Sequence, residues 1–251
     1  MLKKRVIPTL LYRDYGLIKG VAFDSWRHVG SLMQSISVYN MRDVDELVFL
    51  DITATNENRS PDFNLVDDFA DSCFMPLTIG GGISSIEDVG RLLEVGADKI
   101  AINSAAIKDP NLVTQIANKY GAQCVVASID YKKEADGTYQ VYTNSGKNST
   151  GKTPLELAKI LAESGAGEIM LTSIDLDGTM DGYCLDVSRE IIEAVNVPVI
   201  VSGGAGSYQH MAQALELGAS AVAAASIFHF TEQTPKEARK FLHENGFHVR
   251  I

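Results

Sequence analysis

Two glycine-rich turns in the sequence have the composition of anion-binding sites. Gly80-Gly81-Gly82 follows the apolar run Pro76–Ile79, and Gly203-Gly204-Ala205-Gly206 follows the apolar run Val199–Val201. Glycine lets backbone N–H groups approach an anion closely, and the N-terminus of a following helix adds partial positive charge. Two such turns fit an elongated ligand with two phosphate groups. The alternative is that each glycine pair only forms a tight turn between a strand and a helix.

Hydroxyl and amide groups follow two further apolar runs. Asn103-Ser104 comes after Lys99–Ile102, and Ala225-Ser226 comes after Ala221–Ala224. If these runs are neighbouring parallel strands, their carboxyl ends lie beside the glycine turns. We therefore expect each pair to complete one phosphate-binding cradle.

A carboxylate ends one apolar run, and a leucine ends its counterpart. The segments VIPTLLYR (residues 6–13) and VVASIDYK (residues 125–132) are similar, but Leu11 stands where the second segment has Asp130. An aspartate at a strand end can transfer a proton, whereas a leucine cannot.

Eight apolar, β-branched runs alternate with helical patterns along the chain. Near-continuous apolar runs are typical of parallel strands buried on both faces. Amphipathic segments lie between them, for example Ser85–Leu93 with Ser85 as N-cap and Asp88 in a capping box, and Thr153–Glu163 with Pro154 at its first helical position. The expected strands are Arg5–Leu11, Glu46–Asp51, Pro76–Ile79, Lys99–Ile102, Cys124–Asp130, Glu168–Thr172, Val199–Val201 and Ala221–Ala224. This rhythm predicts an α/β protein, a single (β/α)₈ TIM barrel over residues 1–251.

The two halves of the chain are related. ELVFLD at Glu46 matches EIMLTS at Glu168, PLTIGGG at Pro76 matches PVIVSGG at Pro198, and GADKIAINSAA matches GASAVAAASIF, each pair offset by 122 residues. A constant offset indicates a two-fold half-barrel repeat, about 1–122 and 123–251. A doubly wound open sheet is the less favoured alternative, because it does not need this duplication.

Composition limits the partners and the location. The formal net charge of −10 argues against nucleic acid or an anionic membrane as the main partner. Cys73, Cys124 and Cys184 are odd in number and lack metal-ligand spacing, so we expect reduced thiols, no metal and a cytoplasmic protein. The N-terminus does not resemble a signal peptide, and no apolar run approaches a membrane span. No motif for a cofactor is evident.

Several blocks of the sequence resemble the HisF family, the cyclase subunits of imidazole glycerol phosphate synthase. They are KRVIP, DELVFLDITAT, IGGGI, GADKIAINSAAI, SGKNSTG, GAGEIMLTSIDLDGT, SGGAG and AASIFHF, and the resemblance runs from residue 1 to residue 251. It implies a (β/α)₈ barrel and a lyase of histidine biosynthesis. It also implies that ammonia from a HisH-like glutaminase crosses the barrel to a phosphorylated substrate.

The resemblance also implies site residues. Asp130 matches one of the family's two catalytic aspartates, and the other falls on Leu11. The phosphate- or substrate-binding positions match Lys19, Asp51, Gly82, Asn103, Ser104, Ser145, Thr172, Asp177, Gly178, Gly203, Gly204, Ala225 and Ser226.

The first loop departs from the family pattern. Losing one member of an acid/base pair costs about 10²–10⁴ in rate, and Asp14 is a candidate replacement. Thr9 stands where a cysteine is common, and Ser31-Leu32 follow Gly30 where Asp-Pro is usual. The loop is therefore expected to suit a different ligand.

At the opposite end, the family's ammonia gate is fully matched. It consists of alternating charges at strand starts: Arg5, Glu46, Lys99 and Glu168. Asp98 matches a residue at the glutaminase contact. The alternative is a salt-bridge plug that only stabilises the barrel.

Three functions remain open. The first is a histidine-pathway cyclase, which Leu11 opposes. The second is a non-cyclising paralogue that relays ammonia to an amidotransferase of lipopolysaccharide or surface-sugar biosynthesis, which Leu11 and the intact gate favour. The third is the related isomerase family on the same half-barrel plan, which also needs an acid at position 11 and lacks the gate.

Overall fold

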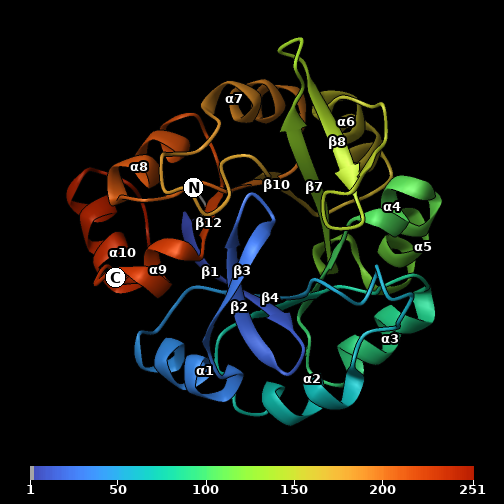
Figure 1. The fold of residues 1–251 in the computed structure, drawn as a ribbon, viewed down its shortest axis with the longest axis horizontal. Helices are drawn as coiled ribbons and strands as arrows, with labels where there is room; N and C mark the ends of the chain where they lie inside the picture. Colours follow the sequence, from blue (N-terminus) through green and yellow to red (C-terminus); the bar gives the residue numbers. More distant parts are fainter. Residues whose placement is uncertain (1–2) are drawn as a thin grey trace.

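The computed structural model describes residues 3–251, and its core is a closed barrel of eight parallel strands. The barrel strands are β1 (Arg5–Arg13), β4 (Leu47–Asp51), β5 (Leu77–Gly80), β6 (Lys99–Ile102), β7 (Val125–Lys133), β10 (Glu168–Ser173), β11 (Val199–Ser202) and β12 (Ala221–Ala224). They pair in this order, and the β1–β12 pairing closes the ring (Figure 1). The predicted (β/α)₈ TIM barrel is therefore confirmed. The predicted boundary between half-barrels falls in the 3₁₀ helix Ala122–Cys124, directly before β7.

Helices surround the barrel and follow its strands (Figure 1). They are α1 (Leu32–Met41), α2 (Phe63–Ala70), α3 (Ile86–Glu94), α4 (Ser104–Lys108), α5 (Asn111–Tyr120), α6 (Pro154–Glu163), α7 (Leu185–Ala194), α8 (Tyr208–Glu216), α9 (Ser226–Phe230) and α10 (Pro235–Glu244). The predicted N-caps are confirmed, since Ser85 forms a capping box with Asp88 and Thr153 forms one with Glu156. Among residues 3–251, no helix combines the length and the apolar character that crossing a membrane requires.

Apolar side chains form two separate layers. The larger fills the space between the strands and the surrounding helices. The smaller lies inside the barrel and consists of Ile7, Val48, Ala101, Val126, Met170, Ile200, Ala221 and Ala223. Since side chains alternate along a strand, the residues two positions on from this inner layer also face the barrel axis. Along each strand, the first inward-facing residues therefore lie at the N-terminal end of the barrel, and the last ones lie at the mouth.

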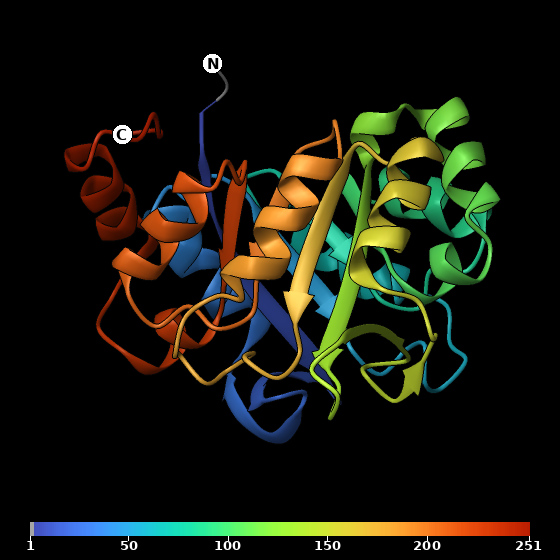
Figure 2. The ribbon, with the colours of Figure 1, turned by 90° about the horizontal axis from the view of Figure 1, so that it is seen from above.

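Two antiparallel extensions were not predicted from the sequence. The strands β2 (Gly16–Val21) and β3 (Asp24–Gly30) form a hairpin on the end of β1, and β8 (Tyr139–Thr143) and β9 (Asn148–Ser149) extend β7 in the same way. The hairpin crosses the barrel mouth in Figure 1. In Figure 2 it projects from the end toward which the strand arrows point, while both labelled termini lie at the opposite end.

Candidate active site

A cavity of about 450 Å³ occupies the C-terminal mouth of the barrel. The structure brings every predicted mouth residue to this one cavity, although they come from distant parts of the chain. These are Leu11, Lys19, Asp51, Gly82, Asn103, Ser104, Asp130, Ser145, Thr172, Asp177, Gly178, Gly203, Gly204, Ala225 and Ser226. Their placement at the carboxyl ends of barrel strands is where catalytic sites of this fold lie. Their individual roles remain predictions.

Asp130, near the end of β7, is held by hydrogen bonds from neighbouring side chains. Asn103 donates its side-chain amide to Asp130 Oδ2 at 2.9 Å, and Ser128 Oγ lies 3.4 Å from Oδ1. Burial, together with the smaller effect of the nearby Asp177 carboxylate, raises the pKa of Asp130 to about 7. A carboxyl group with this pKa can both give and take a proton near neutral pH.

Leu11 places an apolar side chain in the same mouth. It is 8% exposed and pairs with Ile18 of β2 and Leu50 of β4. Asp14, the candidate replacement, lies in the exposed turn between β1 and β2. Its carboxylate contacts Arg13 Nε at 2.9 Å, and it borders a separate shallow pocket outside the mouth cavity. In this structure Asp14 does not supply the missing carboxylate.

Lys19 brings a buried ammonium to the mouth. It lies on β2, is 1% exposed and pairs with the Asp177 carboxylate. Burial raises the pKa of Asp177, and the charge of Lys19 partly offsets this rise. The backbone N–H of Ala22 also donates to Asp177 O at 2.7 Å, so the hairpin is joined to the loop after β10. The sequence predicted Lys19 as a site residue but not that it lies on a buried strand.

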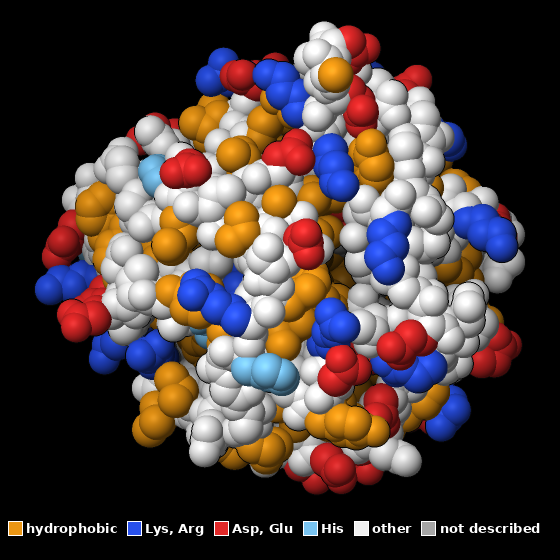
Figure 3. Space-filling model, in the orientation of Figure 1, with side chains coloured by type: hydrophobic (Ala, Val, Ile, Leu, Met, Phe, Trp, Pro, Cys, Tyr) orange, Lys and Arg blue, Asp and Glu red, His pale blue; other side chains and the backbone are white. Residues whose placement is uncertain are grey.

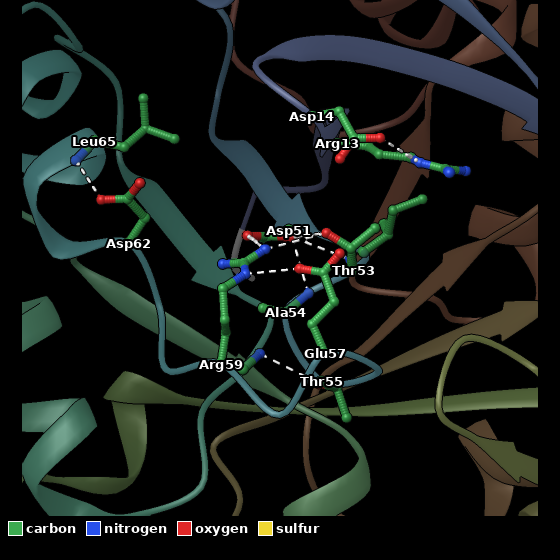
Figure 4. Close-up of polar contacts among 12 residues, drawn as sticks. Arg13, Asp14, Asp51, Thr53, Ala54, Thr55, Glu57, Arg59, Asp62 and Leu65 are labelled. Carbon is green, nitrogen blue, oxygen red and sulfur yellow. Dashed lines mark hydrogen bonds and ion pairs between the residues drawn. The ribbon is translucent and has the colours of Figure 1, made fainter.

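Asp51 organises the loop that follows β4. Its Oδ1 accepts hydrogen bonds from the Thr53 and Ala54 backbone N–H groups, and Arg59 Nη2 lies 3.0 Å from its Oδ2 (Figure 4). Arg59 also lines the cavity. Sequence reasoning missed this arginine because it lies in an irregular loop that is distant in sequence from both glycine turns.

Backbone packing restricts both glycine turns. A Cβ on Gly82 would lie 2.5 Å from Arg59 O, and one on Gly204 would lie 1.9 Å from Gly182 O. Both residues also have positive φ, at +73° and +116°. Tight packing alone therefore requires glycine at these two positions, so the glycines do not by themselves prove an anion site.

The serines beside the two turns differ. Ser104 Oγ accepts a hydrogen bond from the Asn144 backbone N–H at 3.1 Å. Ser226 Oγ is buried in the cavity wall and has no hydrogen-bond partner within residues 3–251. A buried hydroxyl without a partner is costly, and a bound anion would satisfy it. The second cradle thus shows an independent sign of a polar ligand.

Ser145 connects loops of different units. It accepts a hydrogen bond from Asn56 Nδ2 at 3.0 Å and donates one to Ile52 O at 2.8 Å. The turn between β8 and β9 is thereby fixed to the loop after β4. In this arrangement the hydroxyl of Ser145 positions the cavity wall.

The mouth is less acidic than the chain as a whole. Lys19, Arg59 and Lys108 line the cavity, and Figure 3 shows several Lys and Arg side chains around the centre of this face. Asp51, Asp130 and Asp177 line the cavity as well, so its charges nearly balance, and cationic groups in a cleft can attract anionic ligands even on an acidic protein. The cavity therefore suits a phosphorylated small molecule.

A closed ring of four charged side chains lies at the other end of the barrel. The four ion pairs are Arg5–Glu46 at 2.6 Å, Arg5–Glu168 at 2.7 Å, Lys99–Glu46 at 2.9 Å and Lys99–Glu168 at 3.1 Å. Thr78 also donates its hydroxyl to Glu46, which is 2% exposed, at 2.8 Å. Burial lowers the pKa of Arg5, but the two glutamates outweigh this effect and raise it overall.

Asp98 lies beside this ring on the exposed N-terminal end. Its carboxylate accepts a hydrogen bond from the Leu77 backbone N–H at 2.8 Å. The residue therefore has a structural contact of its own, and its predicted contact with a glutaminase stays a prediction.

The inner apolar layer separates the charge ring from the mouth cavity. Ile7, two residues after Arg5, belongs to this layer, as do Val48, two after Glu46, and Met170, two after Glu168. Met170, Ala101 and Ala223 also line the cavity. Along the barrel axis, charge is thus followed by an apolar section and then by the polar mouth.

These features define the class as a TIM barrel with an acid and basic groups at its mouth and a charge ring at its base. The sequence model of the family described as "Histidine biosynthesis protein" (His_biosynth) matches residues 5–234, so the chain belongs to this family. The family match and the closed barrel together fit a HisF-like protein of the type found in histidine biosynthesis.

Proposed function

We propose that this chain is a HisF-type synthase subunit. In this proposal it receives ammonia from a HisH-like glutaminase at its N-terminal face and delivers it to a phosphorylated substrate at the mouth. The supporting observation is the closed ring of Arg5, Glu46, Lys99 and Glu168, followed along the axis by the inner apolar layer and the cavity.

The apolar section along the barrel axis favours passage of neutral ammonia over the ammonium ion. Ammonium is strongly disfavoured in an apolar section, because a buried charge without a partner loses its hydration. Ammonia can pass such a section, and it keeps its nucleophilicity because it carries no extra proton. The four ion pairs of the ring must separate locally to admit it, so the ring can act as a gate.

The mouth supports a phosphorylated substrate. The unpartnered hydroxyl of Ser226 and the glycine turn at Gly82 both line the cavity, as do the cationic side chains of Lys19, Arg59 and Lys108. The family reaction forms imidazole glycerol phosphate by ring closure, which needs an acid and a base. Asp130 can serve as one of them.

A second candidate function is relay without ring closure. Leu11 replaces the second aspartate, and Asp14 lies outside the cavity. These two observations favour a non-cyclising paralogue that passes ammonia to an amidotransferase of lipopolysaccharide or other surface-sugar biosynthesis. In both candidates the barrel carries ammonia from a glutaminase.

The partner is tested by co-expressing the chain with a HisH-like glutaminase. We expect a stable one-to-one complex in size-exclusion chromatography and faster glutamine hydrolysis than with the glutaminase alone. Asp98→Asn should weaken the complex. Asp136→Asn is the matched control, because Asp136 is also exposed and also accepts a backbone hydrogen bond, from Thr138, but lies in the β7–β8 turn at the mouth end. A monomeric barrel without glutaminase stimulation would contradict the proposal.

Ring closure separates the two candidates. The family's bisphosphate substrate and an ammonium salt are supplied to the purified complex, and imidazole glycerol phosphate is measured. Product formation at a rate typical of the family supports the cyclase. Glutamine hydrolysis without ring closure supports the relay.

A further inference from the structure

One wall of the mouth cavity is apolar. Leu11 and Leu50 contribute from the barrel strands, and Phe23 and Trp26 contribute from the β2–β3 hairpin. Asp130 lines the same cavity from β7, across the barrel from β1, with its carboxylate held by Asn103. A ligand in this cavity therefore meets the carboxyl group of Asp130 on one side and, on the other, a patch in which Leu11, Leu50 and Phe23 carry no hydrogen-bonding group and Trp26 carries only its indole N–H. Thr9 of β1 and Lys19 of β2 also line the cavity on this second side.

Contacts to other units fix the hairpin that carries the aromatic part of this wall. Lys19 pairs with Asp177, and the Arg27 guanidinium lies over the Phe230 ring at 3.7 Å. Phe23 lies against the turn between β8 and β9, since a Cβ on Gly146 would be 3.3 Å from Phe23 Cδ2. Phe23 is thus positioned between the first and fifth units of the barrel.

Trp26 is packed closely on its own hairpin. A Cβ on Gly20 would lie 2.8 Å from Trp26 Cε3. Its ring is half-buried and borders both the mouth cavity and the shallow outer pocket. Gly20 therefore leaves room for the indole against β2, where the ring lies between the cavity and the outer pocket.

We propose that Leu11, Leu50, Phe23 and Trp26 form an apolar subsite that binds an alkyl or other C–H-rich group of the ligand. The inference rests on the proposed function, in which the ligand is phosphorylated, and it specifies that the part of the ligand beside Leu11 is non-polar. A ligand hydroxyl placed against Leu11, Leu50 and Phe23 would lose its hydrogen bonds to water, and these three side chains offer no replacement. A methyl or methylene group would gain from leaving water. The subsite thus selects against a fully hydroxylated ligand.

The test compares two phosphate esters of equal chain length, propyl phosphate and glycerol 3-phosphate. They differ in the hydroxyls of glycerol, so their affinities report on the wall. Trp26 is the only tryptophan of the chain, so its fluorescence reports directly on the subsite. We expect propyl phosphate to shift the emission of the intact protein and to bind at least about fivefold more tightly than glycerol 3-phosphate, since two non-polar carbons replace two hydroxylated ones.

Substitutions in the wall test whether the preference for propyl phosphate depends on Leu11 and Trp26. Leu11→Asn should remove the preference for propyl phosphate, as measured by isothermal titration calorimetry. Trp26→Gln provides the same test on the hairpin if the Leu11 variant does not fold, and Trp26→Phe should keep most of the preference. Phe74→Ala is the control, because this side chain is 83% exposed and precedes β5 at the opposite end of the barrel. It should leave both affinities unchanged.

Three outcomes would overturn the subsite. The first is equal affinity for the two esters. The second is an unchanged preference for propyl phosphate in the folded Leu11→Asn and Trp26→Gln variants. The third is binding detected by calorimetry without any change in Trp26 fluorescence. Binding of inorganic phosphate shows whether a negative result concerns only the apolar subsite or the proposed function as well. If phosphate binds and the esters are not distinguished, only the apolar subsite is wrong. If phosphate and both esters fail to bind, the phosphorylated ligand of the proposed function is wrong as well.

Discussion

Leu11 and Asp130 line one cavity from β1 and β7, which stand opposite each other in the ring β1-β4-β5-β6-β7-β10-β11-β12. The two residues hold corresponding positions in the two halves of the chain, at the ends of the matching segments VIPTLLYR and VVASIDYK. The mouth therefore presents a carboxyl group on one side and an apolar side chain on the other. This asymmetry limits the acid/base chemistry that the site can perform.

The wild-type chain is expected to show little ring closure on the family's bisphosphate substrate with free ammonia. An acid/base pair lacking one member loses about 10²–10⁴ in rate, or about 3–6 kcal/mol in barrier. Leu11→Asp should raise the rate, as measured by formation of imidazole glycerol phosphate. Asp14→Asn is the control and should have no effect on that gain. A wild-type rate equal to that of ordinary family members would show that position 11 is not required.

The stability of the fold should depend on Asp130 in a pH-dependent way. Its pKa is raised to about 7 in the folded state from 3.8, so between these values the unfolded chain releases a proton that the folded chain keeps. The contribution of Asp130 to stability is therefore complete below about pH 4 and is lost as the pH rises through about 7.

Asp130→Asn removes this loss and keeps an oxygen that can accept the Asn103 amide. Relative to wild type, the free energy of unfolding of the variant should increase by about 1–3 kcal/mol as the pH rises from 4 to 8, because one unit of pKa corresponds to about 1.4 kcal/mol. Urea unfolding of both proteins at the two pH values measures the difference. A pH-independent difference would show that Asp130 is ionised at neutral pH.

The charge ring should stabilise the N-terminal end of the barrel. Arg5→Met leaves the buried Glu46 with Lys99 and Thr78 as partners but removes the two shortest ion pairs of the ring, those with Glu46 and Glu168. We expect a loss of about 1–3 kcal/mol in the free energy of unfolding, below the range for fully buried pairs because Arg5 is 20% exposed.

Lys240→Met is the control for this change. Lys240 pairs with Glu244 at 3.9 Å, and both side chains are largely exposed, so its removal should change stability by less than about 0.5 kcal/mol. Equal effects of the two substitutions would mean that the ring contributes no more than an ordinary surface pair.

Phosphate should bind at both glycine turns. In crystals grown with phosphate we expect one ion near Gly82, Asn103 and Ser104 and another near Gly204, Ala225 and Ser226. Ser226→Ala should weaken phosphate binding by about tenfold, because a hydrogen bond to a charged group contributes about 1.5 kcal/mol.

Calorimetry with inorganic phosphate measures this loss, and Ser37→Ala on α1 serves as a control distant from the cavity wall. Ser37 is exposed and donates its hydroxyl to Met33 O within the helix. Crystals with density at neither turn would argue against a bisphosphate ligand.

Local patterns in the sequence were sufficient for the barrel and for the residues at its strand ends. Apolar runs with helices between them and the capping residues Ser85 and Thr153 depend on near neighbours, and the constant offset of 122 residues is visible by comparing the two halves of the sequence. Strand ends of a closed parallel barrel meet at one face, so the position of Asp130, Gly82 and Gly204 in the mouth followed once the barrel was assumed.

The covering of the mouth was decided only by the tertiary structure. The segments of β2 and β3 contain glycines and charged residues that are typical of a loop, yet β2 pairs with β1 and β3 pairs with β2 beyond the barrel wall. Lys19 and Phe23 are held at the cavity by residues that are far away in the chain, Asp177 and Gly146 respectively.

The raised pKa of Asp130 and the unpartnered hydroxyl of Ser226 have the same origin. Both depend on burial by residues from several units, which no short stretch of sequence contains. The sequence by itself determined which groups reach the mouth, because strand alternation is local. Their protonation, partners and cover were determined by long-range packing, because desolvation depends on everything that surrounds a group in space.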